Sequence, residues 1–350
     1  MKRSEIADLT AQIVAARWAS SRERRTGDWP AQTWQALTEA GLLGIGIDPN
    51  TGGSGGTLAD AAEVLWTLGS AGIPLPVAET GVLAGWLLAT AGLPLPDGPA
   101  TVAVAPHDDL LQRDGENWRL RTRLARVPWA QRAVVIVVWC ASDDGVDRVV
   151  ALYPPNVTIV AGHNLAGEPR ETVTVDCLVD AQQVVAAPRG IDRERLLRRG
   201  ALTRAVLMAG ALERIAELTI SYSNTRTQFG KPIIAFQAVA SMVVEVVEQT
   251  VAAAAAARAA IAAGDEGVFE IAVAKQQTGA AAETVTRLAH QAHGAIGMTT
   301  EYELGGLTRR LWCWRTEYGT AAQWARDIGE QVSTAGADQL WPRITRRESM

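Results

Sequence analysis

Lysine and cysteine are both scarce in this sequence, and each shortage narrows the class of protein. Only three lysines occur in 350 residues and the formal net charge is −5, so nothing indicates a nucleic-acid or polyanion partner. The three cysteines, Cys140, Cys177 and Cys313, are far apart in the chain and odd in number. They fit neither a disulfide framework nor a metal-binding spacing, and they favour a reducing cytoplasm.

The sequence also lacks a long uninterrupted apolar run. Its apolar stretches meet charges or glycines before they reach the roughly 20 residues that span a bilayer, so we expect no membrane span. Met1, Lys2 and Arg3 are followed by Ser-Glu-Ile-Ala-Asp rather than by an apolar segment, so we expect no secretory leader. A cytoplasmic protein with two or three domains and a sizeable core is the expectation.

The spacing of apolar residues changes twice along the chain. Residues 1–98 show mainly helical spacing. Residues 99–188 instead contain short β-branched runs separated by turn clusters, which predicts a small antiparallel sheet or barrel. Residues 189–350 return to helical spacing, with long segments at Leu202–Ser221, Ile234–Ala263 and Val268–His293. The prediction is a mainly α fold: an N-terminal helical domain (1–98), a central β domain (99–188) and a C-terminal four-helix bundle domain (189–350).

The stretch from Arg226 to Ile233 reads Arg-Thr-Gln-Phe-Gly-Lys-Pro-Ile and forms a corner between two of these helical segments. Pro232 ends the first helix before the second begins. Such a corner can offer a guanidinium to a phosphate and an aromatic ring to a flat base, which a nucleotide cofactor requires. Taken alone, such a corner with an exposed arginine more often has a structural role.

A second motif gives the corner its context. The first motif resembles the R-x-Q-F-G-K-P-I-x-x-F-Q signature of the flavin-dependent acyl-CoA dehydrogenases, and Phe236-Gln237 completes it. Residues 291–297, Gln-Ala-His-Gly-Ala-Ile-Gly, resemble a second family segment, which continues to Arg309-Arg310. Both motifs occur in the family's order, and the helical–β–helical arrangement matches over nearly the whole chain.

This resemblance implies oxidation of the Cα–Cβ bond of an acyl-CoA thioester to a trans-2-enoyl-CoA, with FAD as the cofactor. In the family a glutamate takes the α-proton, the flavin takes the β-hydride, and an electron-transfer flavoprotein-type acceptor follows. The FAD lies across a subunit interface, so a neighbouring subunit contacts its ADP half. The cofactor-binding residues that the resemblance implies are Arg226, Gln228, Phe229, Ile233, Phe236, Gln291, Gly294 and Ala295. Ala295 departs from the family's glycine, although a backbone N–H contact can survive the added methyl group.

Neither position that matches a catalytic glutamate of the family is a carboxylate. The position in the family's C-terminal Y-E-G-T turn falls on Tyr318 of Glu-Tyr-Gly-Thr, and the alternative position on the preceding long helix falls on Gly200. Glu317 lies one residue too early, which in a helix would turn its side chain roughly 100° away. Two roles for Glu317 stay open: an unorthodox base, or a solvated or salt-bridged residue near Arg315.

The central region departs from the family as well. The T-E-P-x-x-G-S-D segment that contacts the flavin ring corresponds to residues 102–109, Val-Ala-Val-Ala-Pro-His-Asp-Asp, so it is missing or remodelled. Trp129 lies near the family's flavin-stacking strand. It could stack on a ring, but among twelve tryptophans a place in the core is favoured.

The chain therefore keeps residues that a neighbour contributes to FAD and lacks those that a subunit uses for its own flavin. In this it resembles the short, base-less subunits of heteromeric α2β2 bacterial acyl-CoA dehydrogenases, which act in steroid side-chain degradation. We predict a subunit that completes the FAD site of a homologous catalytic partner, in steroid side-chain or fatty acid breakdown. Two alternatives stay open: a self-sufficient homo-oligomer with Glu317 as its base, and a scaffold paralogue that has neither FAD nor activity.

Overall fold

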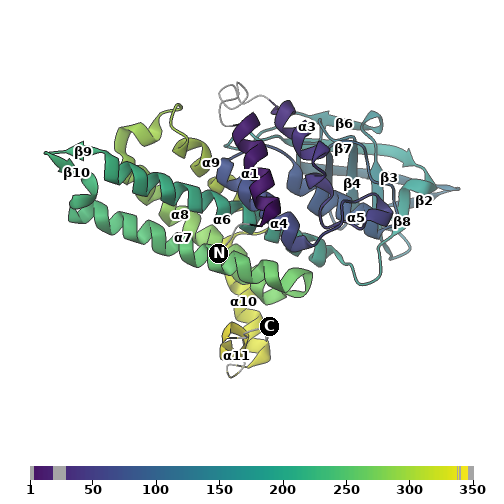
Figure 1. The fold of residues 1–350 in the computed structure, drawn as a ribbon. Helices are drawn as coiled ribbons and strands as arrows, with labels where there is room; N and C mark the ends of the chain where they lie inside the picture. Colours follow the sequence, from purple (N-terminus) through teal and green to yellow (C-terminus); the bar gives the residue numbers. More distant parts are fainter. Residues whose placement is uncertain (1–3, 19–28, 337, 339, 346–350) are drawn as a thin grey trace.

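The fold places helices at both ends of the chain and strands between them. The computed structural model describes residues 4–18, 29–336, 338 and 340–345. Figure 1 shows the two larger sheets on one side of the molecule and the long C-terminal helices extending to the other, where the short hairpin of β9 (Thr227–Gln228) and β10 (Lys231–Pro232) lies. This arrangement confirms the predicted mainly α fold with a central β region.

The N-terminal helices form the first layer, and most of their apolar side chains face the core. The helical segments are α1 (Glu5–Arg17), α3 (Ala31–Glu39), α4 (Leu58–Ala71), a π-helical segment (Ala78–Gly85) and α5 (Trp86–Thr90). Helix α4 begins with a capping box, in which Thr57 and Asp60 satisfy each other's backbone N–H groups. The wide π turns carry the buried carboxylate Glu79 into the interior, and such turns are frequent at functional sites.

Two four-stranded sheets follow, with strand orders β1-β4-β5-β8 and β2-β3-β7-β6. Their strands are β1 (Ala100–Val104), β2 (Gln112–Asp114), β3 (Asn117–Pro128), β4 (Val135–Ala141), β5 (Asp147–Leu152), β6 (Val157–Val160), β7 (Arg170–Val179) and β8 (Val184–Ala186). The prediction of an antiparallel sheet was wrong at one place, because β1 and β4 pair in parallel. A parallel pair needs a long crossover connection, and here β2 and β3 of the other sheet supply it.

A β-bulge interrupts the longest strand. The register between β3 and β7 shifts between Leu124 and Val127, and Arg126 within the bulge has a positive φ of 58°. Bulges bend a strand and re-aim its side chains. This bulge lies beside the turn that follows helix α9, so it faces the C-terminal helices.

The C-terminal helices pack into a bundle around one long central helix. They are α6 (Arg193–Thr225), α7 (Gln237–Ala263), α8 (Val268–His293), α9 (Leu304–Trp314), α10 (Ala321–Ala335) and α11 (Leu340–Thr345). A Cβ at Gly69 of α4 would collide with the carbonyl of Leu207, and one at Gly210 of α6 with that of Trp66. The two helices thus touch backbone to backbone, which fixes α6 against the N-terminal layer.

Helix α7 has an unusual composition. Within the described residues, Gln237–Glu266 is the one helical segment long and apolar enough to cross a membrane, judged by length and composition alone. In the fold it runs alongside α8 and α6 (Figure 1).

Candidate functional site

The turn between α9 and α10 contains Tyr318, the residue that matches the family's C-terminal catalytic glutamate. Tyr318 in this turn has a positive φ of 56°, and its ring lies directly on Gly200 of α6. A Cβ built on Gly200 would collide with that ring. The two positions matched to catalytic glutamates therefore meet in space, and an aromatic ring fills the volume that a carboxylate at either one would occupy.

Both carboxylate oxygens of Glu317 accept hydrogen bonds from buried guanidinium groups. Arg170 donates to Oε1 from Nε (2.8 Å) and to Oε2 from Nη2 (3.1 Å), and Arg204 donates to Oε2 from Nε (2.6 Å). Burial alone would raise the pKa of Glu317, but the charges and hydrogen bonds of Arg204 and Arg170 lower it to about 2. A carboxylate so strongly held as the anion is a poor general base.

One of the two interpretations of Glu317 was a solvated or salt-bridged residue near Arg315. The salt bridge is confirmed, but the implied partner is wrong. Glu317 is salt-bridged, but its partners are Arg170 and Arg204. Arg315 pairs instead with Glu283 at 3.1 Å. Proximity along the sequence suggested the wrong partner, because the true ones come from strand β7 and helix α6.

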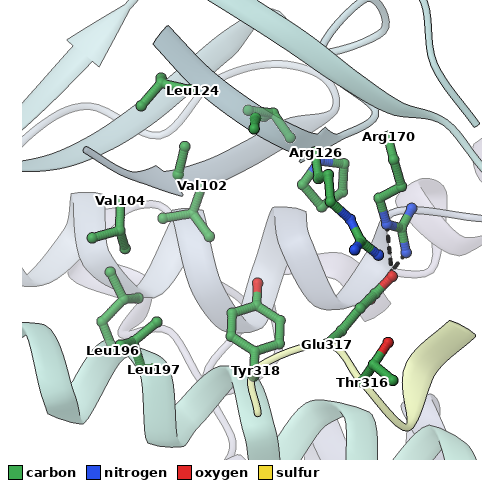
Figure 2. Close-up of a pocket in the computed structure, with 14 residues that line it drawn as sticks. Val102, Val104, Leu124, Arg126, Arg170, Leu196, Leu197, Thr316, Glu317 and Tyr318 are labelled. Carbon is green, nitrogen blue, oxygen red and sulfur yellow. Dashed lines mark hydrogen bonds and ion pairs between the residues drawn. The ribbon is translucent and has the colours of Figure 1, made fainter. Parts of the chain in front are cut away.

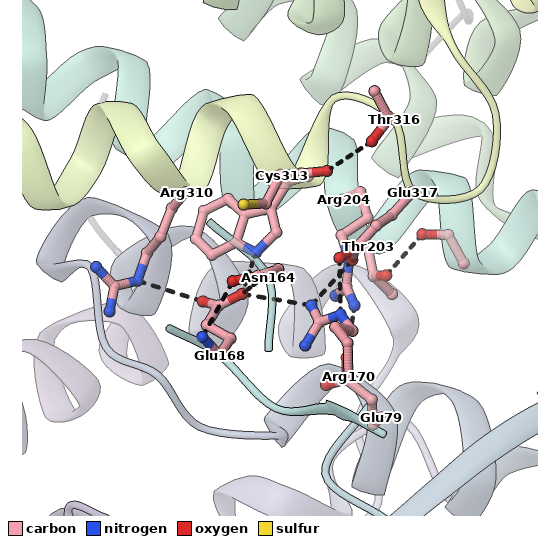
Figure 3. A network of polar contacts seen from close by, with 12 residues as sticks. Glu79, Asn164, Glu168, Arg170, Thr203, Arg204, Arg310, Cys313, Thr316 and Glu317 are labelled. Carbon is pink, nitrogen blue, oxygen red and sulfur yellow. Dashed lines mark hydrogen bonds and ion pairs between the residues drawn. The ribbon is translucent and has the colours of Figure 1, made fainter. Parts of the chain in front are cut away.

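A chain of buried charges extends from Glu317 (Figure 3). Arg204 reaches Glu79 at 2.5 Å, while Arg170 also contacts Glu168 at 3.3 Å. Glu168 in turn contacts Arg310 at 3.3 Å. The cavity beside this network has a volume of only about 20 Å³, so the interior behind the turn is filled with paired charges instead of open space for an acyl chain.

A buried lysine of helix α8 is hydrogen-bonded to the turn between α9 and α10. Lys275 of α8 is fully buried and donates from Nζ to the carbonyl oxygens of Arg315 (2.9 Å) and Gly319 (2.7 Å). Burial and the nearby charge of Arg204 lower the pKa of Lys275 to about 7. The two hydrogen bonds tie both ends of the Tyr318 turn to the bundle.

A pocket of about 320 Å³ lies in front of Tyr318, between the β region and the start of α6 (Figure 2). Its walls are mostly hydrocarbon, and among the described residues that line it only the side chains of Arg126 and Tyr318 have unpaired polar groups, because the Thr316 hydroxyl donates to the carbonyl of Cys313 (3.1 Å). An isoalloxazine ring needs several hydrogen-bond partners along its polar edge, and this wall offers few. The pocket residues therefore fit the flavin ring poorly.

Trp129, the candidate for stacking on a flavin, lies away from this pocket. It is 7% exposed, and its ring packs edge-on against Trp29 with centroids 5.4 Å apart. Trp34 also packs against Trp29, with ring centroids 5.4 Å apart. Trp129 thus occupies the core, as the favoured interpretation predicted.

The opposite end of α6 presents the first sequence motif on the surface. Strands β9 (Thr227–Gln228) and β10 (Lys231–Pro232) form a hairpin whose central residues, Phe229 and Gly230, both have positive φ. That is the geometry of a type I′ turn, which normally prefers Asn-Gly. Phe229 is 91% exposed in this strained conformation.

Arg226 stands at the base of the same hairpin. Its backbone N–H donates to Tyr222 and its carbonyl accepts from Ile233, which fixes the main chain. Its exposed guanidinium makes no hydrogen bond or ion pair within the described part of the chain. A fixed backbone, an exposed guanidinium and the exposed ring of Phe229 suit a phosphate and a flat base; that ring packs edge-on against Phe236, with centroids 6.1 Å apart.

The second motif lies at the same end of the bundle. The ring of Tyr222 stacks on His293 with centroids 4.6 Å apart, so the last turn of α8 is held against the last turns of α6. His293 donates from Nδ1 to the carbonyl of Ala289 (2.7 Å), which leaves Nε2 to accept from the hydroxyl of Tyr302 (3.1 Å). Gly294, next in the chain, has a positive φ and open space around it.

The remaining cofactor candidates divide between surface and interior. Gln228, Gln291 and Ala295 are exposed beside this corner. Ile233 is buried (9% exposed), and Phe236 is half-buried under the ammonium of Lys231, 4.5 Å from the ring centroid. The exposed residues fit the nucleotide half of FAD, while Ile233 and Phe236 support the corner from beneath.

The two ends of α6 are too far apart to serve one small molecule within a single chain. At ~1.5 Å per residue, Gly200 and Thr225 lie about 38 Å apart along the helix axis. Of the groups behind Tyr318, the sequence singled out only Glu317. The others, Glu79, Arg170, Arg204 and Lys275, were missed, although a lysine inside an apolar helix was a usable signal. Within the described residues there is no cluster of His, Cys, Asp and Glu that could hold a metal.

Comparison with known proteins gives a consistent result. A family model described as "Acyl-CoA dehydrogenase, N-terminal domain" matches residues 1–94, and one described as "Acyl-CoA dehydrogenase, C-terminal domain" matches residues 191–333. Acyl-CoA dehydrogenase IpdE2 of Mycolicibacterium smegmatis is 27% identical over 274 residues, which cover 77% of this chain and 78% of the relative.

Solved structures with the same fold include a chain of the ChsE4-ChsE5 complex from Mycobacterium tuberculosis. It aligns with a TM-score of 0.82 at 23% identity, covering 95% of this chain and 98% of that one. Butyryl-CoA dehydrogenase from Megasphaera elsdenii aligns with a TM-score of 0.84 at 19% identity, covering 95% and 99%. At these identities the likeness concerns the fold.

Proposed function

Because this chain belongs to the acyl-CoA dehydrogenase family, whose members are FAD-dependent oxidoreductases, we propose that it completes the FAD site of a homologous catalytic subunit. The assembled enzyme would convert an acyl-CoA thioester to a trans-2-enoyl-CoA and pass its electrons to an electron-transfer flavoprotein-type acceptor. FAD would supply the hydride acceptor for that reaction, and the glutamate that takes the α-proton would belong to the partner.

The observation that carries the proposal is the packing of Tyr318 on Gly200. Neither position offers a carboxylate, and the nearest one, Glu317, is held by two guanidinium groups with its pKa lowered to about 2. Burial raises the pKa of Tyr318 to about 12, so its phenol is protonated at neutral pH and is no substitute base. A chain without a base is inert alone, since a general base typically contributes about 10²–10⁴ in rate.

The corner around Arg226, at the far end of α6, supports the proposed contact with the partner's FAD. The guanidinium of Arg226, the ring of Phe229 and the residues Gly294 and Ala295 are all exposed there. In the assembly they would contact the pyrophosphate and adenine of the partner's FAD. One structural neighbour comes from a complex of two named proteins, ChsE4 and ChsE5, which also favours a two-protein assembly.

The decisive experiment records visible spectra of the purified chain alone and after reconstitution with a homologous full-length partner. We expect a flavin band and enoyl-CoA formation only with the partner. A stoichiometric flavin band with turnover by the chain alone would establish a self-sufficient homomer. Absence of flavin under every condition would support the scaffold alternative, in which the chain has neither FAD nor activity.

Arg226→Ala tests the contact itself. Loss of a charge-assisted contact, worth roughly 1.5–3 kcal/mol, should weaken FAD retention by the assembled complex about tenfold or more. Arg326→Ala is the matched control, because Arg326 is an exposed arginine on α10, outside the corner. Equal flavin content in the two variants would rule out the contact.

A further inference from the structure

We infer that the pocket in front of Tyr318 binds a small molecule with an apolar body and a single carboxylate group. This inference concerns a ligand of the present chain itself, and it does not depend on the FAD contact at the far end of α6.

The walls suit an apolar body. The pocket volume of about 320 Å³ falls at the lower end of the ~300–1,000 Å³ usual for small-molecule sites. Side chains from both sides of the pocket are aliphatic; they include Val102, Val104, Leu124, Val127, Leu196 and Leu197. Moving hydrocarbon from water onto such walls is favourable in proportion to the area covered.

Two strained residues converge on the pocket. Among the described residues, only four non-glycine residues have positive φ, and two of them, Arg126 and Tyr318, line this pocket. They come from different elements, one from the β3 bulge and one from the turn after α9. Such conformations persist where the surrounding structure enforces them, and they cluster at ligand sites.

Both strained residues present free hydrogen-bond donors. Figure 2 shows the Tyr318 hydroxyl directed toward Val102 and the guanidinium of Arg126 directed toward the turn. Neither group makes a hydrogen bond or ion pair with another residue in the part of the chain that the structure describes. Because the phenol stays protonated at neutral pH, the Tyr318 hydroxyl and the Arg126 guanidinium are both hydrogen-bond donors. A ligand that fits them must therefore carry a hydrogen-bond acceptor.

The charge of the pocket selects a monoanion. Three charged residues line it, and two of them, Arg170 and Glu317, neutralise each other. Arg126 therefore leaves one unpaired positive charge. One carboxylate matches that charge and the planar fork of a guanidinium, whereas a doubly charged phosphate would need a second cation.

Isothermal titration of the full chain with octanoate and with octan-1-ol tests the inference, because the two probes share a body and differ in charge. We expect octanoate to bind more tightly, and Arg126→Gln to weaken octanoate about tenfold while leaving octan-1-ol unchanged. Tyr318→Phe should weaken octanoate by a smaller factor. Arg123→Gln is the matched control, since Arg123 is exposed on the same strand but outside the pocket.

A second variant locates the site independently of charge. Ala125 is exposed at the pocket rim, so Ala125→Trp should fill the pocket without disturbing the core and abolish binding of both probes. Absence of octanoate binding at millimolar concentration would overturn the inference. So would octanoate affinity that Arg126→Gln and Ala125→Trp leave unchanged. Riboflavin binding that octanoate displaces would assign the pocket to a flavin ring and overturn it as well.

Discussion

Replacing Glu317 with glutamine separates a structural from a catalytic role for this residue. The amide removes one negative charge from between Arg170 and Arg204, which are both buried. Removing one partner of a buried ion pair typically costs ~3–5 kcal/mol, because the remaining charge is left uncompensated. We therefore expect Glu317→Gln to lower the free energy of unfolding by an amount in that range.

The lowered pKa of Glu317 gives an independent value for its contribution to the free energy of unfolding. It is lowered from 4.5 to about 2 in the folded chain, which corresponds to stabilisation on the order of 3 kcal/mol at neutral pH. Because the folded pKa lies below the unfolded one, this stabilisation is complete above pH ~4.5. It is lost as the pH falls toward ~2, so the gap between wild type and variant should narrow over that window.

Urea unfolding at pH 7 and at acidic pH measures the effect, with Glu283→Gln as the control. Glu283 pairs with Arg315 on the surface, where its side chain is 63% exposed, and such pairs contribute at most ~1 kcal/mol. Turnover of the reconstituted complex should stay within a few-fold of wild type for both variants. Equal stability of the two variants would refute the structural role. A thousand-fold loss of turnover in folded, FAD-loaded Glu317→Gln complex would make Glu317 the base.

Three further changes probe the turn and the corner. Tyr318→Phe should change the free energy of unfolding by less than ~0.5 kcal/mol and complex turnover by no more than a few-fold, because the lost hydroxyl has no protein partner; calorimetry and an enoyl-CoA assay check this. The pKa of Lys275 is lowered to about 7 in the folded chain, so the folded chain binds a proton there less readily than the unfolded chain does. The free energy of unfolding should therefore rise between pH 7 and ~10, by up to ~1.4 kcal/mol per pH unit. Lys275→Met should lose that rise in urea titrations at pH 7 and 9. Phe229→Asn should stabilise the isolated chain by roughly 0.5–1 kcal/mol, because asparagine tolerates positive φ, yet weaken FAD retention in the complex; a stabilised variant with full retention would contradict the role of the ring.

Much of the fold was predictable because its signals are local. Short β-branched runs marked the region that holds β1 to β8, and helical spacing marked α7 and α8 close to their observed bounds. The parallel pairing of β1 with β4 was not predictable, because the alternation within a strand does not encode its neighbour. The π turns of Ala78–Gly85 were also missed, since tertiary packing, not composition, widens a helix.

The site shows the same division. Motif spacing singled out Tyr318, Gly200 and Glu317 as individual positions, but their mutual contacts depend on tertiary structure. Arg204 is 113 residues from Glu317 and 125 from Glu79, and no local pattern announces such pairs. The apolar residues around Arg204 and Lys275 signal that these side chains are buried, but they do not identify the residues that pair with them.

Under the proposed role, the contacts around Tyr318 also predict that one substitution would not make this chain a catalyst. A glutamate at position 318 would lie among the charges of Arg204, Glu79, Glu317 and Arg170, and the strongest of these, Arg204, would hold the carboxylate as its anion and weaken it as a base. A glutamate at Gly200 would collide with the Tyr318 ring. The corner around Arg226, about 38 Å away along α6, shares no partner with this network, so changes at the two ends should act independently. One end of the helix can therefore retain a surface for a partner's cofactor while the other is filled with paired charges, and that division is what a non-catalytic subunit of a shared-cofactor enzyme requires.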